Sequence, residues 1–69
     1  MNFIELTGKD GKKFIGNINL LQSVFTTKEG ITAVVGWNNN GWMEVKEDYE
    51  TVLKMVNARM AGVNTLQTI

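Results

Sequence analysis

The stretch Gly36–Trp42, GWNNNGW, lies between two strand-like segments and contains both tryptophans of this 69-residue chain. The preceding segment, Ile31–Trp37, is rich in β-branched residues, which predicts a central β-strand. Asparagine and glycine are the usual residues of tight turns. We therefore expect a hairpin that returns at Trp42, and the length of its turn decides how the sheet is built.

The register of this hairpin follows from the length of the turn. A four-residue turn would pair the two tryptophans with each other and mix apolar with charged side chains on one face. A three-residue turn, Asn39–Gly41, would instead pair Val35 with Val45 and put Trp37 on the same face. The large apolar side chains left on the opposite face are Val34 and Trp42. Because this register separates apolar from polar side chains, we expect Trp37 in the core and Trp42 facing outward.

Short apolar runs separated by glycine and asparagine predict further strands before this hairpin. The expected strands are Phe3–Leu6, Lys12–Asn17 and Leu20–Thr27. Asp10 and Gly11 form a typical hairpin-turn pair between the first two strands. Leu20 and Leu21 are also compatible with a single helical turn.

After Asp48 the apolar spacing changes from a period near two to a period near 3.6, which predicts a helix over residues 49–61. Asp48 is a suitable N-cap, Glu50 is favourable in the first turn, and Gly62 is a suitable end. The apolar stripe of this helix consists of Tyr49, Val52, Leu53, Val56 and Met60. We expect the stripe to cover the sheet, because so short a helix depends on tertiary packing.

These segments together predict an α+β fold, a small antiparallel sheet of four or five strands followed by one C-terminal helix packed on one face. Residues 1–62 would form a single domain and residues 63–69 a C-terminal tail that docks on a neighbour. The expected core consists of Ile4, Leu6, Phe14, Val35, Trp37, Val45, Val52, Leu53 and Val56.

The composition limits the possible functions. There is no cysteine and no histidine, so we expect no disulfide, metal site or cofactor. Seven basic and seven acidic residues balance, so no overall field attracts the chain to nucleic acid or to anionic lipid. We find neither a signal-peptide pattern nor an apolar run long enough to span a membrane, and expect a cytoplasmic protein.

No arrangement of residues predicts catalysis. The acidic residues nearest to one another are Glu44, Glu47, Asp48 and Glu50. Asp48 and Glu50 have roles at the helix start, and the other two lie along or beside an exposed strand. The glycines beside the lysines of the first turn are not followed by a helix, so they do not form a phosphate-binding loop. We therefore expect a protein that is not an enzyme.

The order of elements resembles the small flagellar FlbD family over roughly residues 4–57. The features that carry the resemblance are Phe14 and Asn17 in the second strand, Leu21 and Val24 three residues apart, the Asn40-Gly41 turn, and Val45-Lys46-Glu47 leading into an acidic, amphipathic helix. The resemblance implies a non-enzymatic accessory protein, with no catalytic residues. The chain would accordingly be of bacterial origin, and a phage protein of the same kind fits the sequence equally well.

Two functional classes fit these observations. The first is a protein-binding or self-associating module, most simply a homodimer, with contacts at Val34, Trp42, Leu66 and Ile69. The second is a small protein that binds single-stranded nucleic acid, in which Trp42 stacks on a base. The phosphate contacts would then be Lys9, Lys12, Lys13 and Lys46. We favour the first class because of the expected outward Val34 and Trp42, the small size, the apolar tail and the electrical neutrality of the chain.

Overall fold

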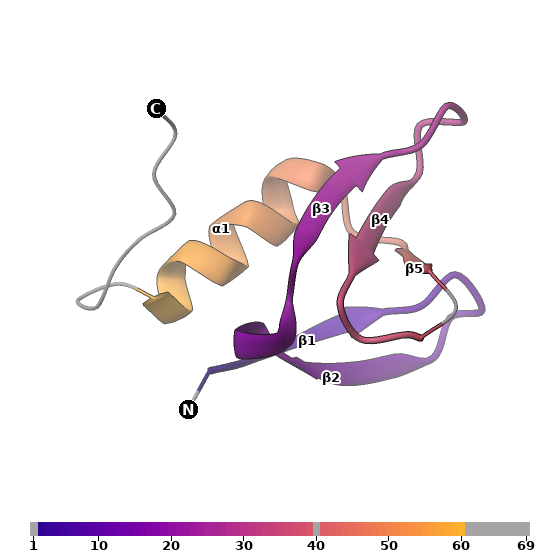
Figure 1. Cartoon of the computed structure of the whole chain (residues 1–69). Coiled ribbons are helices and arrows are strands. Elements are labelled where there is room, and N and C mark those ends of the chain that lie inside the picture. The colour runs from indigo at the N-terminus through magenta and orange to yellow at the C-terminus, as the bar shows by residue number, and fades with distance from the viewer. Residues whose placement is uncertain (1, 40, 61–69) are drawn as a thin grey trace.

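The computed structural model describes residues 2–39 and 41–60, which form five strands, one short 3₁₀ helix and one α-helix (Figure 1). In chain order these are β1 (Phe3–Thr7), β2 (Lys13–Asn17), η1 (Ile18–Leu20), β3 (Ser23–Thr26), β4 (Thr32–Val35), β5 (Trp42–Val45) and α1 (Tyr49–Met60). All strand pairs are antiparallel, so the predicted α+β class is confirmed. The strands divide into two sheets, however, with the orders β1-β2 and β3-β4-β5.

The hairpin of β1 and β2 follows the prediction closely. Its turn is closed by a bond from the Gly8 N–H to the Lys12 carbonyl at 2.8 Å, and the Asp10 carboxylate accepts from the Lys12 N–H at 2.9 Å. Gly11 has a φ of 88°, a conformation that favours glycine. The register pairs Leu6 with Phe14, which turns both side chains toward the interior.

The predicted register of the β4–β5 hairpin is wrong. The structure pairs Val34 with Met43 and Val35 with Trp42, and the connection covers residues 36–41. Directly opposed residues share a face of the sheet. Val34 and Met43 therefore lie on the core side, where Val34 is 1% exposed. Val35 and Trp42 lie on the outer face, where Val35 is half-buried.

A close contact at Gly36 explains the shift. Gly36 has a φ of 129°. The carbonyl oxygen of Leu20 lies where a Cβ on Gly36 would be. The backbone therefore turns away from the sheet directly after Val35, so Trp37 never joins the ladder.

Trp37 packs against β2 instead. Its indole N–H donates to the Asn17 carbonyl at 2.8 Å, and its ring meets Phe14 edge to face at 5.8 Å. The ring also lies on Gly16, at the place where any Cβ would stand. Trp37 is thus half-buried at the border of the core, and it fastens the connection after β4 to the other sheet.

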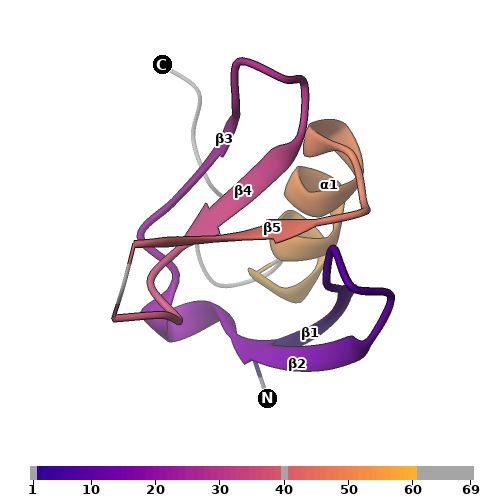
Figure 2. The same ribbon diagram turned by 90° about the vertical axis from the view of Figure 1, so that its right-hand side faces the viewer.

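The two sheets meet where β1 and β5 end. An isolated bridge pairs Gly8 with Val45, the Lys46 N–H donates to the Thr7 carbonyl at 2.8 Å, and the Lys9 N–H donates to the Glu44 carbonyl at 3.1 Å. In Figure 2 the ribbon of β1 and β2 lies below the other strands, with α1 along one side. The helix packs on β1 and on β3, so it covers the interior between the sheets.

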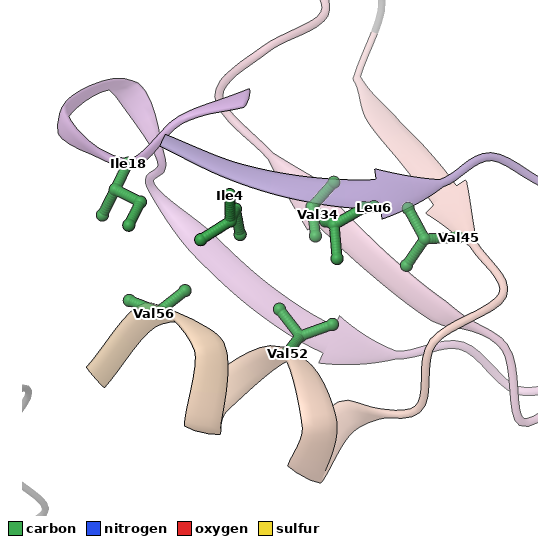
Figure 3. Close-up of a cluster of buried hydrophobic side chains, with 7 residues drawn as sticks. All are labelled: Ile4, Leu6, Ile18, Val34, Val45, Val52 and Val56. Atoms are coloured by element: carbon green, nitrogen blue, oxygen red, sulfur yellow. The ribbon is translucent and has the colours of Figure 1, made fainter. Parts of the chain in front are cut away.

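The core is entirely aliphatic (Figure 3). It consists of Ile4, Leu6, Ile18, Val34, Val45, Val52 and Val56. Of the expected core, Phe14 and Trp37 pack against it half-buried, and Leu53 is half-buried on the helix. The prediction that Val35 belongs to the core is wrong, because Val35 lies on the outer face. The buried valine of this strand is Val34.

The helix begins as predicted. The Asp48 carboxylate accepts from the Thr51 N–H at 2.8 Å, which satisfies one of the free donors of the first turn. Val52 and Val56 face the core. Gly62, the expected end of the helix, lies outside the described residues.

Glu47 fastens the start of the helix to β1. Its carboxylate accepts from the Thr7 N–H and from the Thr7 hydroxyl, both at 2.9 Å. Burial raises the pKa of Glu47, but the hydrogen bonds from Thr7 and from the backbone N–H of Glu47 itself, together with the charge of Lys13, lower it by more in sum. The net pKa lies below the ordinary value of 4.5, so the ionised carboxylate stabilises the folded state.

The contact of Trp37 with Gly16 predicts that Gly16→Ala destabilises the protein. The added methyl would collide with the indole ring, and we expect a loss of roughly 1 to 3 kcal/mol, as for overpacking elsewhere. The measurement is the free energy of unfolding in urea. Gly30→Ala is not a suitable control, because Gly30 has a positive φ. The matched control is Ser23→Ala at an exposed strand position, and equal losses would contradict the contact.

The pKa of Glu47 predicts a pH dependence of stability. A carboxyl group with a lowered pKa contributes stability at neutral pH and loses it as the pH falls below 4.5 and through the folded pKa. Glu47→Gln should therefore cost about 1 kcal/mol at pH 7 and much less near pH 3. Glu5→Gln, at an exposed position of β1, is the charge-matched control. A Glu47→Gln effect that is the same at both pH values would contradict this assignment.

Candidate functional site

The outer face of the three-stranded sheet is not covered by the helix. The register places Phe25 opposite Ala33, and Ala33 in turn opposite Glu44. Val35 and Trp42 form the neighbouring pair on the same face. These side chains face away from Val34 and the core, so we define them, Phe25, Ala33, Val35, Trp42 and Glu44, as the outer face.

Two aromatic rings meet across this face. Phe25 on β3 and Trp42 on β5 pack edge to face, with ring centroids 5.2 Å apart and planes at 85°. Ala33 lies between them on β4 and is fully buried, so its small side chain leaves the space in which the rings meet. Edge-to-face packing favours a fixed ring orientation. The face thus presents a preformed aromatic pair.

Trp42 remains open to solvent on this face. Its side chain is 50% exposed, although it packs on Phe25. Beside it lies a hollow of 340 Å³ lined by both rings and by the turn residues after β3. The predicted outward position of Trp42 is therefore confirmed, although the register from which it was predicted is wrong.

An ion pair borders the aromatic pair. The Lys9 ammonium lies 3.1 Å from the Glu44 carboxylate, and the Trp42 indole N–H donates to the same carboxylate at 3.4 Å. The hydrogen bond from Lys9, with a smaller contribution from Trp42, holds the pKa of Glu44 below its usual range. Glu44 therefore stays charged at neutral pH and orients both neighbours.

The residues predicted for a partner contact have three different outcomes. Trp42 lies on the outer face as expected. The outward placement of Val34 is wrong, because the side chain is buried in the core next to Val45 and Leu6 (Figure 3). Leu66 and Ile69 lie outside the described residues.

Three of the four lysines predicted for phosphate contacts lie near carboxylates. Lys9 pairs with Glu44, and the charge of Lys13 acts on Glu47. Lys9 and Lys46 line one hollow together with Glu47 and Asp48. Lys12 follows Asp10 by two residues in the first turn, and its side chain is exposed. The structure does bring Lys9 near Trp42, but both contact an acidic side chain.

Sequence reasoning missed Phe25 and Val35 as members of the outer face. The run Thr32–Val35 is apolar on both of its faces, so its periodicity does not indicate which residues point inward. The small Ala33 between larger residues was the available signal, because a small side chain in a central strand makes room for its neighbours.

No protein-family model matches this chain, and neither a curated protein nor a solved structure matches it. Within residues 2–39 and 41–60, no group of three or more acidic side chains is placed to hold a metal ion. Across the same residues, no helix has the length and apolar character that crossing a membrane requires.

The different surroundings of the two tryptophans predict different costs of removal. Trp37→Ala removes a packed ring and a hydrogen bond, and we expect a loss of roughly 3 kcal/mol. Trp42→Ala loses mainly the contact with Phe25, about 1 kcal/mol. Urea unfolding at low protein concentration measures both, so that any association adds little. Losses of similar size in the two variants would show that the two sites are assigned wrongly.

Proposed function

We propose that this chain is a small, non-enzymatic accessory module that binds protein, and that its first partner is a second copy of itself. The contact surface is the outer face, centred on the ring pair of Phe25 and Trp42. The observation that carries the proposal is the half-exposed Trp42 on the outer face, whose ring is held in a fixed orientation by its edge-to-face contact with Phe25.

The chemistry of the outer face fits a protein partner. Tryptophan and other aromatic residues are enriched at the centres of protein interfaces, where they bury a large area at a small entropic cost. The Lys9–Glu44 pair borders the rings and provides the polar rim that such interfaces usually have. The face therefore combines an apolar centre with a polar border.

A homodimer is the simplest assembly for this surface. A two-fold contact uses the same patch on both copies and closes without leaving an exposed surface for further growth. Sheets pack face to face at about 10 Å, with side chains of the two inner faces interdigitating. Two copies of the outer face would meet in this way, with Trp42 of each copy within or at the rim of the contact.

The three neighbouring acidic residues from β5 to the start of α1 support a non-enzymatic role. Glu44 orients Lys9 and Trp42, Glu47 holds Thr7, and Asp48 caps the helix. Each of these three carboxylates thus has a structural partner. The resemblance to the FlbD family also favours a non-enzymatic accessory protein.

Binding of single-stranded nucleic acid is the second candidate. The proximity of Lys9 to Trp42 favours it, since a base would stack on the ring while a cation meets phosphate. Against it, the same Glu44 carboxylate holds both groups, and a phosphate would have to replace it. We therefore rank this candidate below self-association.

Self-association through the outer face predicts that the protein sediments as a dimer at micromolar concentration. Trp42→Ser and Phe25→Ser should both shift it to a monomer, because each removes one ring of the pair. Ile15→Ser is the matched control, since Ile15 is 70% exposed on β2, away from this face. A wild-type monomer at about 100 μM, or a dimer that survives Trp42→Ser, would contradict the proposal.

The same proteins distinguish the second candidate. Fluorescence titration with a single-stranded oligonucleotide at low and high salt should show no binding. Salt-sensitive binding that is lost in Trp42→Ser, by a protein that remains monomeric, would replace self-association by nucleic-acid binding.

A further inference from the structure

A second apolar surface lies on the other side of the three-stranded sheet. A groove of 440 Å³ runs between α1 and the start of β3. Its apolar lining includes Ile18, Leu21, Val24, Leu53, Val56 and Met60. Val24 is opposite Val34 on the core side of the sheet, so this groove does not share a face with Trp42.

The edge of β3 beside the groove is open. Among the described residues β3 pairs only with β4. The Thr27 N–H donates to the Ile31 carbonyl at 2.8 Å, and hydrogen-bonding direction alternates along an antiparallel strand. Ser23 and Phe25 therefore bond toward β4, while the backbone groups of Val24 and Thr26 point to the open edge.

An open strand edge beside an apolar groove is suited to an extended segment. The segment adds to the edge through backbone hydrogen bonds, and every second side chain enters the groove. Because the wall of the groove formed by α1 is apolar, the side chains that enter the groove should be apolar too. The occupant is therefore an extended segment with apolar side chains that lies within reach of this edge.

We propose that the occupant is Val63–Ile69 of the same chain, added to β3 as a parallel strand. Met60, the last described residue of α1, itself lines the groove, so the following residues start beside it. Figures 1 and 2 both show α1 running back past β3 in the opposite direction. A chain that reverses at Ala61 and Gly62 therefore continues along β3 in the direction of that strand.

The length and composition of the segment fit this site. Seven extended residues span roughly 23 Å, whereas the groove follows α1 from Tyr49 to Met60, roughly 16 Å. Val63, Thr65, Thr68 and Ile69 are β-branched, which favours a strand. Val63 and Ile69 fall on the same face, so both enter the groove, and Leu66 falls on the opposite face beside Phe25.

Docking of this segment has two consequences. It covers the open edge of β3, which would otherwise be a template for unwanted strand pairing. It also moves Ile69 from the expected partner contact into the groove and leaves Leu66 at the border of the outer face. The inference does not depend on the proposed function, because it concerns the helix side of the sheet.

The test is amide hydrogen exchange of the full chain, measured by NMR in the Trp42→Ser background to remove association. The Val24 and Thr26 amides should exchange at least about tenfold more slowly than exposed amides, because the added strand accepts their hydrogen bonds. Ile69→Asp should abolish this protection by putting a charge into the groove. Asn64→Asp is the matched control, since it adds the same charge on the opposite face of the segment.

The Phe25 amide, which bonds toward β4, reports whether each variant is folded and should stay slow in all of them. Protection of Val24 and Thr26 should not change on tenfold dilution. Rapid exchange of these two amides in the full chain would overturn the proposal, as would protection that is lost on dilution or that survives Ile69→Asp. None of these outcomes depends on whether the outer face forms a dimer.

Discussion

The bonds between the ends of β1 and β5 hold this structure together. Thr7 accepts a backbone bond from Lys46 and donates two bonds to Glu47, while Lys9 bonds to the backbone of Glu44. A two-stranded ribbon is marginal by itself, and a chain of this length buries only a modest part of its surface. The junction joins the ribbon to the three-stranded sheet immediately before the helix begins. It therefore positions α1 so that its valines close one aliphatic core between both sheets.

The two tryptophans have different positions in the structure, although only a few residues separate them in the chain. Trp37 leaves the sheet after Gly36 and locks onto β2, through Gly16 and the Asn17 carbonyl. This contact closes the end of the core away from the β1–β5 junction. Trp42 stays in β5, faces outward and is supported by Phe25. One indole thus contributes mainly to stability, while the other is available for contact.

The three-stranded sheet has a distinct apolar surface on each side. On the outer side a ring pair lies open, with a charged border at Lys9. On the inner side α1 covers the sheet only in part, which leaves the groove beside β3. Each surface has its own proposed occupant, a second copy on the outer side and the segment after Gly62 on the inner side. Both apolar surfaces remain exposed because a single helix is too small to cover the sheet completely.

The sequence by itself determined the secondary elements, the Asp10-Gly11 turn and the Asp48 cap, because these depend on interactions among near neighbours in the chain. Of the predicted helix stripe, Val52 and Val56 face the core, whereas Tyr49 is exposed. The sequence also indicated that Trp42 faces outward. Only the tertiary structure decided the register of β4 and β5, and with it the exchange of Val34 and Val35 between core and surface. The strand Thr32–Val35 is apolar on both faces, so periodicity allows either choice. The choice is made by contacts between distant residues, where the Leu20 carbonyl meets Gly36 and the Trp37 ring meets Gly16.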